Sequence, residues 1–285
     1  MTVRLLGVLG TGLVDRDRPV LHADDLGLTR GDGCFEGCRI VTTAAGVSAV
    51  DKLGAHLARM ARSAEALELP FEAAAWRSLV GQACAAWREQ GEAAMKLILT
   101  RGTVDGGPPV GLLTVSPLPQ DYPRQRRDGL RVVTLSRGMA ADAFTDAPWL
   151  LGGVKTLSYA VNMAAQREAQ RRGADDVIFV SSDGQVLESP TSSVVWSVGR
   201  TLYSPPPGAN GILGGTTQQL LFSRAALAGW GTAGSSAAVA DLHAADALWL
   251  IGSVRGPVDV VALDGKDRSR DATLNAEIRR LAGFG

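Results

Sequence analysis

Residues 152–196 read GGVKTLSYAVNMAAQREAQRRGADDVIFVSSDGQVLESPTSSVVW, and this stretch decides the fold. Apolar residues recur at helical spacing after Lys155, and Gly173 ends that run, which predicts a helix opened by the lysine. The apolar run at residues 177–180 predicts a strand, followed by a polar turn and a second strand that carries Glu188 at its end. We therefore expect one helix–strand–turn–strand unit to fix both a lysine and a glutamate.

The surroundings of Lys155 distinguish it from an ordinary surface lysine. A lone lysine is nearly always a solvated charge, but the neighbours of Lys155 are small or apolar and include no carboxylate. A lysine in such surroundings can act as a nucleophile and form a Schiff base with an aldehyde. The sequence therefore favours a chemical role for Lys155.

Three further blocks accompany this stretch: GDGCFEGCRI at residues 31–40, HLARMARSAEAL at 56–67 and GILGGTT at 211–217. In this order the four blocks resemble the motifs of the class IV aminotransferase family, the pyridoxal-phosphate enzymes of fold type IV. The corresponding family patterns are GDG-x-FE, H-x-x-R-x-x-x-S and G-I-L-x-G-x-T. One block alone would be weak, but four blocks in order span most of the chain.

The resemblance implies an α/β (α+β) architecture with a small N-terminal domain and a larger C-terminal domain. Residues 116–129 are rich in Pro, Arg and Asp and have no apolar period, which is typical of a link between domains. We expect domains over residues 1–120 and 130–285, a linker over 121–129, and the Schiff-base lysine in the second domain. Helices are expected over about 216–227 and over 272–281. The family also implies a homodimer.

The resemblance further implies pyridoxal 5'-phosphate as the cofactor. Lys155 would form the Schiff base and then move the substrate's proton, while Glu188 would keep the pyridine nitrogen protonated. Arg59 would hold the phosphate, because its planar fork donates two hydrogen bonds to phosphate oxygens. The other cofactor-binding candidates are Tyr159, Ser192, Ser193, Gly215, Thr216, Thr217 and Ser253.

One departure from the family pattern and three substrate candidates complete this set. Ser193 stands where the family often has asparagine, so the usual side-chain amide bonds are in doubt. The strand that contains Phe35 and Arg39 would line the substrate side of the cofactor. Arg255 could hold a substrate carboxylate, although a surface arginine is the alternative.

Composition argues against several other functions. The 285 residues carry no formal net charge, so no basic field attracts nucleic acid or anionic lipid. No apolar run approaches the ~20 residues of a membrane span, and the N-terminus shows no signal peptide. The three cysteines give no disulfide framework, so we expect a cytoplasmic protein. Neither Cys34 and Cys38 nor the three histidines show metal-ligand spacing, so no metal is predicted.

The reaction is predicted from two absences and from the resemblance of GDGCFEGCRI, residues 31–40, to aminodeoxychorismate lyases. D-amino-acid aminotransferases carry Arg-x-His shortly after the strand that ends in TRG, but residues 100–109 contain neither side chain at that place. Branched-chain enzymes carry Tyr-x-Arg on that strand, where this chain has Lys96-Leu97-Ile98. We therefore prefer aminodeoxychorismate lyase, which handles one amino substrate and gives 4-aminobenzoate and pyruvate. Amino transfer with branched-chain or D-amino acids is the alternative, and an inactive binding protein on the same fold is the third.

Overall fold

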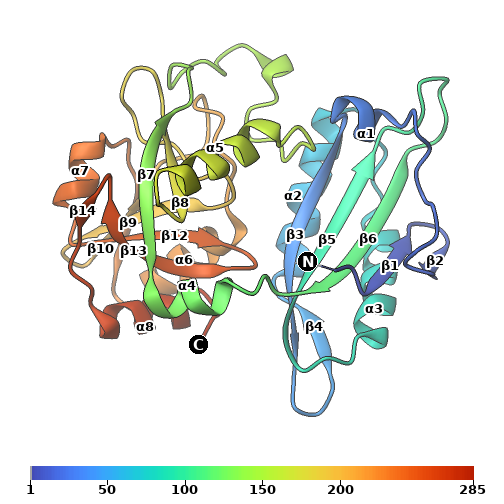
Figure 1. Cartoon of the computed structure of the whole chain (residues 1–285), viewed down its shortest axis with the longest axis horizontal. Helices are drawn as coiled ribbons and strands as arrows, with labels where there is room; N and C mark the ends of the chain where they lie inside the picture. Colours follow the sequence, from blue (N-terminus) through green and yellow to red (C-terminus); the bar gives the residue numbers. More distant parts are fainter. Residues whose placement is uncertain (1) are drawn as a thin grey trace. The chain divides into compact units, whose positions relative to one another are not determined.

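The computed structural model describes residues 2–285, which form two compact units (Figure 1). Unit 1 contains the described residues up to Pro119 and the short segment Val154–Tyr159. Unit 2 contains Gln120–Gly153 and Ala160–Gly285. Lys155 thus groups with unit 1, whereas the sequence had placed it in the second domain. Residues 2–285 include no helix that is long and apolar enough to cross a membrane.

Unit 1 is built on a six-stranded antiparallel sheet with the order β2-β1-β6-β5-β3-β4. Its elements are β1 Leu5–Val8, β2 Gly12–Val14, α1 Leu26–Arg30, β3 Gly33–Thr42, β4 Ser48–Val50, α2 Leu53–Ala66, α3 Ala73–Ala86, β5 Gly91–Thr100 and β6 Val110–Pro117. The long central strands β3 and β5 pair from Gly33 opposite Thr100 to Thr42 opposite Gly91. Alternate residues of β5 are buried, so one face of the sheet forms the core with α2 and α3.

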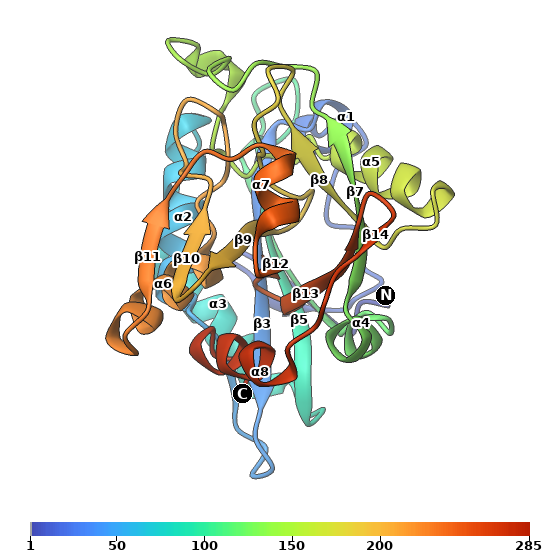
Figure 2. The same cartoon turned by 90° about the vertical axis from the view of Figure 1, so that its left-hand side faces the viewer.

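Unit 2 contains a mixed eight-stranded sheet, in which seven strands follow the order β11-β10-β9-β12-β13-β7-β8 and β14 pairs with β13. Figure 2 shows this run of strands. The elements are α4 Tyr122–Asp128, β7 Leu130–Ser136, η1 Pro148–Leu150, α5 Ala160–Arg171, β8 Asp176–Val180, β9 Ser193–Val198, β10 Thr201–Ser204, α6 Thr216–Leu227, β11 Gly231–Gly234, α7 Val239–Ala244, β12 Ala247–Gly252, β13 Gly256–Leu263, β14 Lys266–Asp267 and α8 Ala272–Leu281.

The core of unit 2 lies on both sides of its central strands. One apolar cluster joins residues of β7, β9, β12 and β13, including Leu130, Val194 and Leu250. A second cluster packs α6 and α8 against β9 and β12, with Trp249 almost completely buried. These clusters use alternate residues of the same strands, as expected for a sheet covered on both faces. The expected helices at 216–227 and 272–281 are confirmed as α6 and α8.

The predicted linker is largely helical. Residues 122–128 form α4, with a proline in its first turn, a position that suits proline because its missing N–H has no partner there anyway. Arg126 ties this helix to unit 2 by donating from Nε to the carbonyl of Arg255 (2.6 Å) and from Nη2 to that of Val254 (2.9 Å). The polar composition of residues 121–129 therefore belongs to a docked surface helix, which begins just after the division between the two units, and the role of these residues as a link between domains stays a prediction.

Candidate active site

The segment around Lys155 is extended, which differs from the helix expected to begin at the lysine. The N–H of Phe35 donates to the carbonyl of Lys155 at 3.0 Å, and the N–H of Leu157 donates to that of Gly33 at 2.9 Å. Strand β4 pairs only with the far end of β3, so the lysine segment occupies the edge that β4 leaves uncovered. Helix α5 starts five residues later, at Ala160. Backbone pairing with β3 therefore fixes Lys155.

The amine of Lys155 lies in an aromatic corner of unit 1. Its Nζ is 3.1 Å from the hydroxyl of Tyr159 and 4.5 Å from the ring centroid of Phe35. The two rings meet edge to face, with centroids 5.0 Å apart. Among residues 2–285 Lys155 forms no ion pair. Three of the sequence candidates, Lys155, Tyr159 and Phe35, are thus brought together, and no carboxylate neutralises the amine.

Arg59 lies beneath this corner, in a network that the sequence reasoning missed. Glu36 is fully buried and accepts from Arg59 Nε at 2.6 Å, from Arg59 Nη2 at 2.7 Å and from His56 Nδ1 at 2.8 Å. Burial opposes ionisation of Glu36, but the bonds and charges of Arg59 and His56 outweigh it and lower its pKa to about 2. The signal was present: residue 36 shares the buried face of β3 with residues 34 and 38, where an unpaired carboxylate could not stay.

A metal ion is disfavoured at this network. Glu36, Cys38 and His56 place possible ligand atoms within 4.8 Å of one another. Both oxygens of Glu36 already accept hydrogen bonds, and the Arg59 guanidinium adds a positive charge beside them. Burial and the neighbouring Glu36 charge also raise the pKa of the Cys38 thiol well above its usual value. A cation would therefore meet a protonated thiol and a carboxylate that is already neutralised.

In unit 2 the glycine-rich turn and its hydroxyls form one cluster. Gly215 caps the start of α6, and the hydroxyls of Thr216 and Thr217 lie 3.0 and 3.2 Å from that of Ser253. A side chain at Gly215 would meet the Ser193 hydroxyl, because an added Cβ would lie 2.3 Å from Ser193 Oγ. Hydroxyls beside the N–H groups of a helix start suit an anion such as phosphate. The structure thus joins five predicted cofactor residues.

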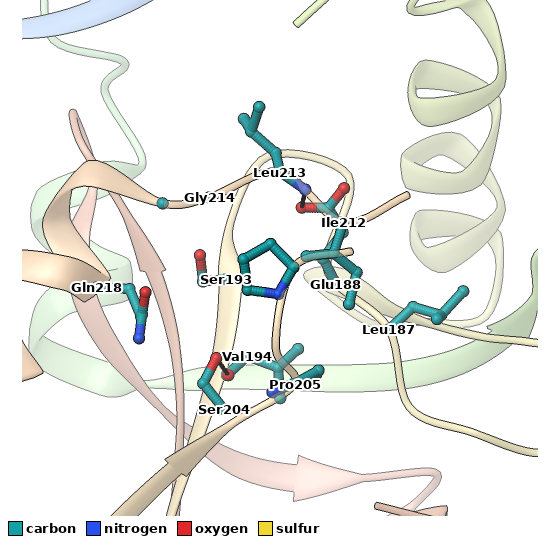
Figure 3. A pocket seen from close by; sticks show the side chains of 12 residues that line it. Leu187, Glu188, Ser193, Val194, Ser204, Pro205, Ile212, Leu213, Gly214 and Gln218 are labelled. Atoms are coloured by element: carbon teal, nitrogen blue, oxygen red, sulfur yellow. Dashed lines mark hydrogen bonds between the residues drawn. The ribbon is translucent and has the colours of Figure 1, made fainter. Parts of the chain in front are cut away.

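Glu188 borders a small pocket next to this cluster. Its Oε2 accepts from the N–H of Leu213 at 3.3 Å, while its own carbonyl accepts from the N–H of Phe179. Figure 3 shows Glu188, Leu213 and Ser193 around the pocket, which Gly214 and Gly215 also line. The residue lies in an irregular segment held by isolated bridges rather than at the end of a strand, as had been expected. The carboxylate is nevertheless fixed within the same unit as the hydroxyl cluster.

Two arginines proposed for the substrate have other partners. Arg255 is buried and donates from Nη2 to Asp176 at 2.7 Å and to the Ser192 hydroxyl at 3.1 Å. Arg39 is also buried and pairs with Asp51 and Glu92. Each arginine is thus paired inside its own unit. Arg255 forms a structural ion pair, in place of the expected contact with a substrate carboxylate. Ser192 belongs to that pair and not to the hydroxyl cluster.

Lys96 is a cation that the sequence reasoning did not select. It is exposed on β5, on the face of the sheet that also carries Phe35, and its Nζ lies 5.9 Å from the centroid of that ring. Lys96 forms no ion pair with any residue in the described range 2–285. The sequence signal that could have identified it is its place between the apolar residues Met95 and Leu97, because alternation along a strand puts Lys96 on the opposite face from them. Two lysine amines therefore lie near one aromatic ring.

Comparison with known proteins gives consistent matches. The family model described as amino-transferase class IV matches residues 33–263. A curated protein of Mycobacterium tuberculosis, named bifunctional aminodeoxychorismate lyase / D-amino acid transaminase, is 42% identical over 257 residues, which cover 87% of either chain.

Solved structures agree over almost the whole length. A hypothetical aminotransferase from Mycobacterium tuberculosis, in an alpha-ketoglutarate and PMP bound form, matches with a TM-score of 0.92 and 38% identity and covers 98% of each chain. A fold IV transaminase from Curtobacterium pusillum matches with a TM-score of 0.90 and 41% identity, covering 98% of this chain and 97% of the other.

Proposed function

The chain belongs to the class IV aminotransferase family, and from that premise we propose that it is a pyridoxal-phosphate enzyme acting as an aminodeoxychorismate lyase. The observation that carries the enzymatic part is the Lys155 amine, which is held next to Tyr159 and Phe35 without a carboxylate. The lyase part is supported by the relative that is 42% identical and named for this activity. The substrate is a small amino compound, 4-amino-4-deoxychorismate, and the products are 4-aminobenzoate and pyruvate.

The residues present fit the cofactor. When bound, pyridoxal phosphate supplies an electron sink for the pair released from a breaking bond. Lys155 offers an amine for the aldehyde, Glu188 a carboxylate that holds a proton at the pyridine nitrogen, and Tyr159 a hydroxyl for the phenolic oxygen. The phosphate needs hydrogen-bond donors, and each unit offers its own: Arg59 in unit 1, and the cluster of Ser193, Gly215, Thr216, Thr217 and Ser253 in unit 2.

Lys155 then acts as the base. With the cofactor in place, the Lys155 amine would take the proton from the ring carbon that bears the substrate's amine. Breaking this bond and the neighbouring ether C–O bond makes the ring aromatic and releases enolpyruvate, which gains a proton to become pyruvate. Tyr159, whose hydroxyl is 3.1 Å from the amine, orients the lysine for this transfer. Lys96 is our candidate for the substrate's carboxylate, in place of Arg255.

Amino transfer is the second candidate, favoured by one observation. The same relative is named as bifunctional, for D-amino acid transamination as well as for lyase activity. The lyase needs one substrate, whereas transfer needs a 2-oxo acid as well. Transfer must bind an amino acid and a 2-oxo acid in turn, and Arg39 and Arg255 are already paired, so we expect transfer to be the slower reaction. The third reading, an inactive binding protein, does not account for the presence of both Lys155 and Glu188.

A paired assay tests this function. The purified enzyme, loaded with pyridoxal phosphate, receives 4-amino-4-deoxychorismate without any 2-oxo acid, and 4-aminobenzoate is measured. A parallel series offers D- and L-amino acids with 2-oxo acids. Release of 4-aminobenzoate supports the lyase, whereas efficient transfer with no 4-aminobenzoate would replace it with the aminotransferase.

We further propose a homodimer in the cytoplasm. All three cysteines are free thiols, which fits a reducing compartment. Light scattering should give twice 29.8 kDa or a multiple of it. A strictly monomeric enzyme with full activity would contradict the dimer.

A further inference from the structure

Glu36 is the most completely enclosed charged group around the lysine. It lies on the buried face of β3 and has no exposed surface, and neither have Cys34 and Cys38 on either side of it. Its three hydrogen bonds come from two residues of α2, His56 and Arg59, which are three positions apart and therefore on the same side of the helix. The carboxylate thus connects the central strand of unit 1 to one face of α2.

Stability alone does not explain this arrangement. A buried ion pair can often be replaced by apolar residues of similar volume without loss of stability, because desolvation of the charges offsets their attraction. Within the described residues 2–285 the network also leaves His56 Nε2 buried without a hydrogen-bond partner, which adds to the cost. What the pair does provide is a fixed orientation, because a guanidinium held through both Nε and Nη2 cannot turn about its side chain.

The network also supports the lysine directly. Ser63, one turn beyond Arg59 on the same face of α2, accepts from the N–H of Lys155 at 3.2 Å. Phe35, next to Glu36 in β3, donates its N–H to the carbonyl of Lys155. Both elements joined by Glu36 therefore hold the backbone of the reactive residue. The network fixes the charge of Arg59, and Arg59 lies on the same face of α2 as Ser63.

We propose that Glu36, held in turn by His56, is a positioning residue that fixes the Arg59 guanidinium in the orientation that recognises the phosphate group of the cofactor. This inference rests on the proposed function, since it takes Arg59 as a phosphate ligand. Glu36 itself touches no substrate or cofactor. Its effect is to remove the rotamer freedom of a long side chain before the phosphate arrives, so that less entropy is lost on binding.

The test measures how well the apoenzyme distinguishes pyridoxal phosphate from pyridoxal, which lacks the phosphate. Dissociation constants for both are obtained by absorbance titration of the wild type, Glu36→Gln, Arg59→Lys and the double variant. We expect Glu36→Gln to lower the preference for the phosphorylated form by about tenfold, as a lost charge-assisted positioning contact would. Because Glu36 acts through Arg59, the double variant should lose little more than Arg59→Lys alone.

Two further variants separate positioning from stability. Thr42→Val is the matched control: Thr42 is buried on the same face of β3 and its hydroxyl bonds to that of Ser48, but it lies away from Arg59. This change should lower the melting temperature and leave the preference for phosphate unaltered. Glu36→Asp keeps the charge on a shorter side chain and should restore part of the preference. If Glu36→Gln does not fold, Glu36→Asp and His56→Leu carry the measurement, with a loss of about threefold expected for each.

The outcomes are distinguishable. A wild type that binds pyridoxal phosphate with a clear preference, beside Glu36 variants with the same preference and a lower melting temperature, would show that Glu36 is only structural. Additive losses in the double variant would also overturn the inference, since Glu36 would then act independently of Arg59. A wild type that binds no pyridoxal phosphate would instead overturn the proposed function and the inference together.

Discussion

Two buried arginine–carboxylate pairs, one in each unit, look alike and differ in what surrounds them. The pairs are Arg59 with Glu36 and Arg255 with Asp176. In each pair the arginine is 6% exposed and the carboxylate is fully buried. The helix face of Arg59 continues to Ser63, which holds the backbone of Lys155. The partners of Arg255 are Asp176, Ser192 and Gln125, and they close the network within unit 2. Burial and pairing are therefore the same for Arg59, which we propose to be functional, and for Arg255, which is structural, and the two arginines differ in their next neighbours.

The largest effect is expected at the residue that distinguishes the two surroundings. Lys155→Ala should lower turnover by at least ~1,000-fold, because both the covalent anchor of the cofactor and the base are lost. Treatment of the wild type with borohydride should fix a pyridoxyl group on the Lys155 peptide, detected by mass spectrometry. Labelling of Lys52, Lys96 or Lys266 instead would refute the assignment. The neighbours of Arg59 would then no longer include the reactive lysine.

In unit 2 the comparison is sharpened by Glu188, which should be catalytic where Arg255 is structural. Glu188→Gln keeps the shape of the side chain but removes the charge opposite the ring nitrogen. We expect turnover to fall by ~100-fold while pyridoxal phosphate still binds, as for loss of one preorganised electrostatic partner. Steady-state kinetics and absorbance titration measure the two effects. Unchanged turnover would mean that the role of Glu188 is only structural.

Substitution of each arginine by glutamine tests the difference between the two pairs. Arg255→Gln should lower the free energy of unfolding by about 3 kcal/mol, because Asp176 is left as a buried unpaired charge, and Michaelis constants should stay the same. Arg59→Gln should lower the free energy of unfolding by a similar amount, because Glu36 is then left unpaired, and should in addition weaken binding of pyridoxal phosphate by ~10-fold or more. Urea unfolding and titration of the cofactor give both quantities for both variants. Equal changes in cofactor affinity would abolish the distinction.

Sequence reasoning succeeded where local pattern or motif was sufficient. The bounds of α6 and α8 follow from their own residues, and Ser193, Gly215 and Ser253 were selected by motif and meet in the structure. It failed where the partner is distant in the chain. Lys155 is extended because β3 supplies its backbone partners, and Arg255 is occupied by an aspartate 79 residues away. Neither pairing leaves a trace in the spacing of nearby residues.

The pH dependence of stability offers a signature of the Arg59 pair. The pKa of Glu36 is about 2 in the folded protein against 4.5 in the unfolded chain, so its contribution is complete above about pH 4.5 and is lost as pH falls through 2. That contribution amounts to about 3 kcal/mol. Burial also lowers the pKa of His56, so protonation in the unfolded chain begins to cost stability below about pH 6.5.

Both shifts act in the same direction, so wild-type stability should decline from pH 6.5 towards pH 2. The decline is measured as the free energy of unfolding in urea at a series of pH values. In Glu36→Gln the part below pH 4.5 should flatten, while Thr42→Val should shift the whole curve without changing its slope. An equally steep decline in Glu36→Gln would assign the acid sensitivity to other carboxylates.

The smallest effect is expected at Lys96, the cation left over once Arg39 and Arg255 are seen to be paired. Lys96→Met should raise the Michaelis constant for the carboxylate-bearing substrate by about fivefold, because an exposed ion pair contributes no more than about 1 kcal/mol. Turnover should change little, since Lys96 is near Phe35 and is not a partner of the Lys155 amine. Lys96→Arg should keep the wild-type constant, and Lys266→Met, at an exposed residue of β14, is the control. An unaltered constant in Lys96→Met would show that this face of the sheet does not bind the carboxylate, and a group outside these three cations would have to do so.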